Sequence, residues 1–95
     1  LHTGARADFA RAHLFAGLPD RALEIVQAGI SQSPDDPSLL TVRGAARAAL
    51  RDVPGAFQDA ERAVELDPTD ENAVLLLASL YDTNARSDRA RQLLE

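Results

Sequence analysis

The stretch that decides the fold lies between Ser33-Pro34-Asp35-Asp36 and Asp67-Pro68-Thr69-Asp70, two similar tetrapeptides that are 34 residues apart. It opens with Pro37-Ser-Leu-Leu-Thr-Val-Arg-Gly-Ala-Ala-Arg-Ala-Ala-Leu-Arg-Asp. The same offset aligns small residues elsewhere in the chain: Ala22 with Ala56 and Ala90, and Ala10 with Gly44 and Ala78. Small residues suit the points where helices cross closely, and proline stops a helix. A period of 34 in a chain of 95 residues predicts about 2.8 copies of a helical repeat.

Within each copy the apolar residues follow a helical period. Val74, Ala78 and Tyr81 lie at i, i+4 and i+7, and no stretch alternates as a strand does. Asp36 followed by Pro37 is typical of a helix N-cap and first turn. We therefore predict an all-α fold in which short turns place neighbouring helices antiparallel. The six predicted helices span about 4–16, 19–32, 37–50, 53–66, 71–84 and 87–95.

The composition excludes several classes of function. All ten basic residues are Arg, and fifteen acidic residues bring the net charge to -5, a poor match for a nucleic-acid backbone. The chain has no Cys for a disulfide or a thiolate metal site, and only two His. It contains no run of about 18 apolar residues that would span a membrane, and no glycine-rich phosphate loop. We expect neither a cofactor nor a metal.

His13 and the acidic turns are the remaining candidates for chemistry. No Ser, Cys or carboxylate is spaced to orient His13 as a base, so we expect a structural role for it. The carboxylates around Asp35 and Asp67 lack the glycine and the oxygen spacing of a Ca²⁺ loop, and they suit helix N-termini instead. The sequence therefore predicts a protein that is not an enzyme.

On these residues the chain resembles the tetratricopeptide repeat (TPR) family. The unit over residues 37–70 matches best and carries the family's small residues and closing proline: Gly44, Ala56, Ala63 and Pro68. The first unit has His13 where the family prefers Tyr. The resemblance implies antiparallel helix pairs stacked as a right-handed α-solenoid, in one domain over residues 1–95 with repeats at about 3–36, 37–70 and 71–95. Because the third repeat stops inside its second helix, we expect the chain to be a fragment of a longer protein.

The second unit departs from the common pattern at two arginines. Arg43 and Arg47 occupy positions that large residues hold in the third unit. A variant of the family is similar here, with Arg-Gly in the first helix and an Asp in the second, where this chain has Asp59. The resemblance therefore implies an ion pair between Arg43 and Asp59, while Arg47 has no equally clear partner. Arg43, Arg47 and Arg51 also form a stripe suited to an anion, although pairing with the unit's own acids, Asp52, Asp59 and Glu61, is the interpretation we favour.

The resemblance also implies a concave groove, because the first helices of successive TPR units line one face on which partners lie. The residues that we expect to line or border this groove are Arg11, Leu14, Phe15, Thr41, Val42, Ala45, Ala48, Leu75, Leu76, Ser79 and Asp82. Family members that bind chaperone C-termini clamp a carboxylate with Lys and Asn here. This chain has no Lys, so such a clamp is disfavoured. The alternative is that Leu75 and Leu76 pack against a helix of the longer protein.

Two functions follow from this surface. The first is a non-catalytic protein–protein interaction scaffold that binds a partner peptide or helix in its groove. The alternative is a self-assembly module that forms a homo-oligomer through its C-terminal helix, where Leu93 and Leu94 have no following unit to cover them. An Ala- and Arg-rich, Lys-free composition is typical of a GC-rich bacterial genome. The absence of Cys fits the cytoplasm and the periplasm equally.

Overall fold

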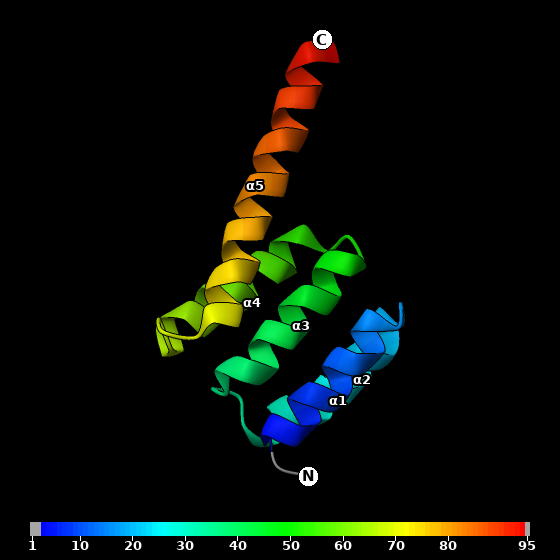
Figure 1. Cartoon of the computed structure of the whole chain (residues 1–95), viewed down its shortest axis with the longest axis vertical. Helices are drawn as coiled ribbons and strands as arrows, with labels where there is room; N and C mark the ends of the chain where they lie inside the picture. The colour runs from blue at the N-terminus through cyan, green and yellow to red at the C-terminus, as the bar shows by residue number, and fades with distance from the viewer. Residues whose placement is uncertain (1–2, 95) are drawn as a thin grey trace.

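The computed structural model of the chain describes residues 3–94, except for the side chains of residues 3, 87, 89–91 and 94. The described residues form five helices and no strand, and consecutive helices fold back on one another (Figure 1). The prediction of an all-helical fold of antiparallel helix pairs is therefore confirmed. The helices are α1 (Thr3–Phe15), α2 (Pro19–Gln32), α3 (Pro37–Ala49), α4 (Val53–Leu66) and α5 (Glu71–Leu94).

The repeat seen in the sequence is also present in the helix boundaries. Helices α1, α3 and α5 begin in steps of 34 residues, and so do α2 and α4. The caps repeat as well. Asp36 accepts the backbone N–H of Ser38 at 2.9 Å, and Asp70 accepts that of Asn72 at 3.0 Å. These carboxylates satisfy backbone donors that the first turn of a helix leaves unpaired, so the second and third repeats each start at a fixed residue.

Helix α3 is the centre of the packing. It contacts each of the other four helices, and α1, α3 and α5 lie side by side with α2 and α4 behind them (Figure 1). Most of the buried hydrophobic residues are alanines, which lets the helices approach closely. Gly44 lies at a close approach of three helices, because a Cβ atom added there would lie 3.0 Å from Leu76, 3.2 Å from Asp59 and 3.3 Å from the carbonyl oxygen of Ala56. A side chain at position 44 would separate α3 from both α4 and α5.

The sequence prediction of a sixth helix over 87–95 is wrong. Helix α5 runs without a break from Glu71 to Leu94, and its second half projects beyond the other four helices (Figure 1). The earlier turns use residues with positive φ at equivalent repeat positions, Gly17 at 79° and Arg51 at 70°. The corresponding stretch, residues 84–88, contains neither Gly nor Pro, and its Ala and Arg favour helix. Ala90, aligned with Ala56 by the repeat, has its side chain outside the described residues.

The third unit also buries a different face from the one that the periodicity predicted. Val74, Ala78 and Tyr81 are exposed, although Tyr81 still contacts the Phe57 ring at a centroid distance of 5.2 Å. The face of α5 that packs on α3 and α4 is formed by Ala73, Leu76, Leu77 and Leu80. The i, i+4, i+7 stripe starting at Val74 therefore identified the helix correctly and its buried face incorrectly.

Candidate functional site

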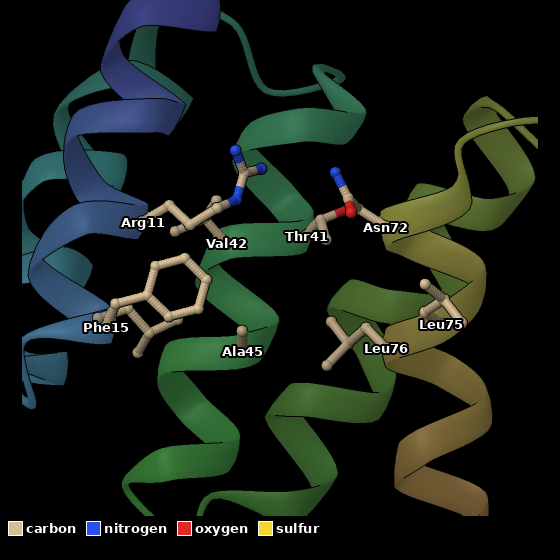
Figure 2. A pocket seen from close by; sticks show the side chains of 9 residues that line it. Arg11, Phe15, Thr41, Val42, Ala45, Asn72, Leu75 and Leu76 are labelled. Carbon is tan, nitrogen blue, oxygen red and sulfur yellow. The ribbon is translucent and has the colours of Figure 1, made fainter.

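Three helices enclose a groove on one face of the molecule. Helix α3 forms its floor, and α1 and α5 form its two walls (Figure 2). Among the described residues, α1 and α5 each contact α3 but make no contact with each other, which leaves the space over α3 open. The pocket has a volume of about 290 Å³. Its lining residues are Arg11, Leu14, Phe15, Thr41, Val42, Ala45, Asn72, Leu75 and Leu76.

The floor consists of short side chains, and the hydroxyl group among them is hydrogen-bonded. Ala45 offers only a methyl group, and Val42 is almost fully buried. Thr41 is buried too, and its hydroxyl donates to the carbonyl oxygen of Pro37, one turn back, at 2.8 Å. The floor therefore presents an apolar surface without an unpaired hydroxyl.

The walls carry large apolar side chains that are open to solvent. Phe15 is 83% exposed, and its ring lies above the floor on the α1 side (Figure 2). Leu75 is 65% exposed on the α5 side, and Leu76 beside it reaches down to Gly44. Phe15 is the last residue of α1, because Gly17, two residues further along the chain, adopts a positive φ that ends the helix. Exposed apolar side chains gathered around one hollow are typical of binding surfaces.

Polar groups stand only at the rim. The Arg11 guanidinium forms an ion pair of 2.8 Å with Asp8, one turn earlier in α1. Asn72 lies across the groove, in the first turn of α5 (Figure 2). The sequence analysis missed Asn72. Its spacing was a usable signal, since Asn72, Leu75 and Leu76 at i, i+3 and i+4 must share one face of a helix.

Eight of the eleven residues predicted to line the groove border this pocket: Arg11, Leu14, Phe15, Thr41, Val42, Ala45, Leu75 and Leu76. The other three do not. Ala48 packs toward Ala56, Ala60 and Leu80. Ser79 is exposed, and Asp82 pairs with Arg86 at 3.1 Å on the part of α5 beyond the pocket. The pocket is therefore confined to the first turn and a half of α5.

Two arginines behind the groove converge on one buried carboxylate. Asp59, 3% exposed, accepts from Arg43 Nε at 3.0 Å and from Arg43 Nη2 at 2.7 Å. Arg47 Nη1 donates to the same carboxylate at 3.0 Å, and Arg47 Nε lies 4.0 Å from Asp52. Arg43 also reaches Gln27 of α2 at 3.3 Å. Arg43 and Arg47 are therefore bound internally, in agreement with the pairing favoured from the sequence, and both share Asp59.

His13 is bound by its own helix. Its Nδ1 lies 3.0 Å from the carbonyl oxygen of Phe9, and its ring meets the Phe9 ring edge-on at 4.7 Å. Within residues 3–94, no group of three or more His, Cys, Asp or Glu side chains is placed to hold a metal ion. No helix in the described part of the chain is both long enough and apolar enough to span a membrane.

No protein-family model matches the chain, and no curated protein matches it. Among solved structures, the chain is similar to the first TPR domain of the human RPAP3 protein, determined by NMR. The two share 21% identity with a TM-score of 0.45, over 92% of this chain and 95% of that one. The fold itself follows from the chain's own geometry, in which paired helices recur every 34 residues around shared caps and turns. The chain therefore has a TPR-like helical-repeat fold.

Proposed function

We propose that the groove between α1, α3 and α5 docks a peptide or helix of another protein, and that the chain acts as a non-catalytic interaction scaffold. The observation that carries this proposal is the placement of Phe15 and Leu75, two exposed apolar side chains on opposite walls of a floor made of short residues. Burying an apolar side chain of this size stabilises a complex by about 1.5–3 kcal/mol. A partner that fills the groove therefore gains binding free energy by burying apolar side chains on both walls.

The lining indicates the chemistry of the partner. Because the floor and walls are apolar, the partner supplies apolar side chains, and the short floor residues leave room for a leucine or phenylalanine. An acidic residue of the partner suits the Arg11 end of the groove. The exposed pair between Arg11 and Asp8 contributes only about 0.2–1 kcal/mol, so exchanging Asp8 for a partner carboxylate costs little.

The groove is also preformed. The Asp36 cap fixes the start of α3, and the close approach at Gly44 fixes α3 against α5. Docking on such a surface requires little ordering of the scaffold, which leaves more of the contact energy for binding.

Selection of peptides from a random displayed library, followed by fluorescence anisotropy of the enriched peptides, tests the proposal. We expect the enriched peptides to carry apolar residues at helical spacing and to bind Ala45→Arg at least about tenfold more weakly than wild type, or ~1.4 kcal/mol. Arginine at position 45 fills the floor from a half-buried site. Gln58→Arg, which adds the same charge to an exposed site on α4, is the matched control.

Both variants should show the same far-UV circular dichroism and melting temperature as wild type. Peptides that bind wild type, Ala45→Arg and Gln58→Arg equally would place the working surface outside the groove and overturn the proposal.

A further inference from the structure

We propose that two copies of this chain pair through antiparallel α5 helices, on a surface that shares Leu75 with the docking groove. The surface, called here the α5 seam, consists of Leu75, Ser79, Asp82, Arg86 and Leu93. Successive members are 4, 3, 4 and 7 residues apart, and the last step passes over Arg89, so the members occupy five of six successive contact positions with coiled-coil spacing. The seam therefore runs along one side of α5.

The α5 seam is open to solvent along its length. It lies on the opposite side of α5 from the residues that pack on α3 and α4, among them Ala73 and Leu80. Leu93 is 87% exposed, and Ser79, Asp82 and Arg86 are all exposed. The second half of α5 projects beyond the rest of the molecule, which leaves room for another helix beside it (Figure 1). A second helix can thus lie beside the projecting half of α5, and it reaches the mouth of the docking groove at Leu75.

The order of residues in the α5 seam is self-complementary. Leu75 and Leu93 lie nine residues before and after Asn84, and Asp82 and Arg86 lie two residues before and after it. When two such helices run antiparallel and cross at the level of Asn84, Leu75 of each copy meets Leu93 of the other. In the same register, Asp82 of each copy meets Arg86 of the other. A two-fold interface of this kind uses the same patch on both subunits, as most homodimers do.

The charges distinguish this register from the parallel one. Within one chain, Arg86 Nη2 lies 3.1 Å from Asp82 Oδ2. In the antiparallel pair the two aspartates and two arginines alternate around the two-fold axis, so that each carboxylate has an arginine on either side. A parallel pair in register would set Asp82 against Asp82 and Arg86 against Arg86, which is repulsive. The pattern therefore selects an antiparallel dimer with leucine contacts at both ends.

The uninterrupted course of α5 makes this surface possible. At about 1.5 Å per residue, the helix carries Leu93 roughly 27 Å from Leu75 along one straight axis. A turn at residues 84–88, like those after α1 and α3, would fold Leu93 back and divide the seam. The α5 seam is thus continuous because no turn interrupts the helix at residues 84–88.

Two single-cysteine variants test the register directly, because the chain has no cysteine of its own. Under mild oxidation, a mixture of Leu75→Cys and Leu93→Cys should form a disulfide-linked heterodimer. Either variant alone should stay largely uncrosslinked, since its two cysteines would lie roughly 27 Å apart. Preferential crosslinking of either variant with itself would overturn the antiparallel register.

Sedimentation equilibrium at protein concentrations up to about 1 mM tests the association itself. We expect wild type to dimerise reversibly and Arg86→Asp to dimerise at least about tenfold more weakly, because all four charges at the axis become negative. The double exchange Asp82→Arg with Arg86→Asp should restore the wild-type affinity. Arg21→Asp, with the same change of charge at an exposed site on α2, should leave the dimer unchanged.

Arg86 does not line the docking groove, so a weaker dimer of Arg86→Asp is distinguishable from a loss of peptide binding there. Leu75 belongs to both surfaces, so a dimer in this register would cover that wall of the groove. A wild-type chain that stays monomeric over the whole concentration range would overturn the inference. So would a double exchange that associates no better than Arg86→Asp.

Discussion

Arg43 donates two parallel hydrogen bonds to Asp59, from Nε to Oδ2 at 3.0 Å and from Nη2 to Oδ1 at 2.7 Å. This pair links α3 to α4 beneath the groove floor. Asp59 is almost fully buried, and Arg47 binds it from a second side. A carboxylate in this position depends on its arginines, because a buried charge without a partner is strongly unfavourable. Loss of this pair should therefore destabilise the packing of α3 against α4.

The two ends of this pair should respond unequally to mutation. Asp59→Ala leaves Arg43 and Arg47 without their shared carboxylate, and it should lower the free energy of unfolding by about 3 kcal/mol. Arg43→Ala leaves Asp59 bound to Arg47 and should cost less, about 1–3 kcal/mol. In urea melts, the double variant should lose less than the sum of the two single variants. Additive losses would show that the two side chains do not stabilise each other.

Gly44 should tolerate no side chain. Alanine is the better helix former by about 1 kcal/mol, yet its Cβ would press against Asp59 and the backbone of Ala56. Overpacking of this kind costs about 1–3 kcal/mol, so we expect Gly44→Ala to be destabilised overall and Gly44→Val more so. Thermal unfolding followed by circular dichroism measures both. Gly4→Ala, where a Cβ would meet nothing within 4 Å, is the control and should be stabilising.

Replacing Arg51 by glycine should stabilise the folded chain. It is exposed and holds a φ of 70°, in the left-handed region where a side chain costs about 1–2 kcal/mol. Arg51→Gly should therefore raise the free energy of unfolding, by about 1 kcal/mol after the added flexibility of the unfolded chain is counted. Ala49→Gly, at an exposed helical site two residues earlier, should lower it by a similar amount. Urea melts showing both variants shifted in the same direction would contradict this account of the turn.

Phe15 should matter for binding and little for folding. Because its ring is largely exposed, Phe15→Ala should change the free energy of unfolding by less than about 0.5 kcal/mol. Leu39→Ala removes a fully buried side chain and should cost about 2–5 kcal/mol. The affinity of a groove-selected peptide should fall at least about tenfold for Phe15→Ala. A large stability loss in that variant would identify Phe15 as a packing residue.

Ala85→Pro should separate the two halves of α5. Proline removes a backbone donor and clashes with the preceding turn, at a cost of about 3 kcal/mol in a helix interior. The packing contacts of α5 come from residues before this point, such as Ala73 and Leu80. We therefore expect the melting temperature to stay near that of wild type while the helical signal and the dimer are reduced. Ala85→Gly, a milder change, should give an intermediate result.

The sequence predicted best where a local chemical signal and the repeat agreed. Asp36 before Pro37 located the start of α3. It predicted poorly where the repeat was extrapolated without such a signal. The turn expected near residue 85 has no glycine or proline to make it, and the helix continues. Local backbone preference outweighs the periodicity there.

The groove was foreseen largely because helix periodicity fixes which side chains share a face. Thr41 and Ala45 are one turn apart, as are Leu14 and Arg11, so a single choice of face placed several residues together. Periodicity does not report where a helix leaves its neighbour, which is why the predicted groove residues Ser79 and Asp82 lie outside the pocket. The second arginine on Asp59 depends on the crossing of α3 and α4, and no spacing within one helix encodes that geometry.

The projecting half of α5 has a thermodynamic consequence. A helix of about 14 residues without tertiary support is marginal in water, because its nucleation cost is barely offset. Residues 81–86, the start of this half, are all exposed, so their backbone amides should exchange with solvent far faster than those of the α3 interior. If pairing is what supports this segment, folding and association are linked. Its hydrogen exchange would then slow as protein concentration rises, and the segment would be ordered only where the protein is abundant.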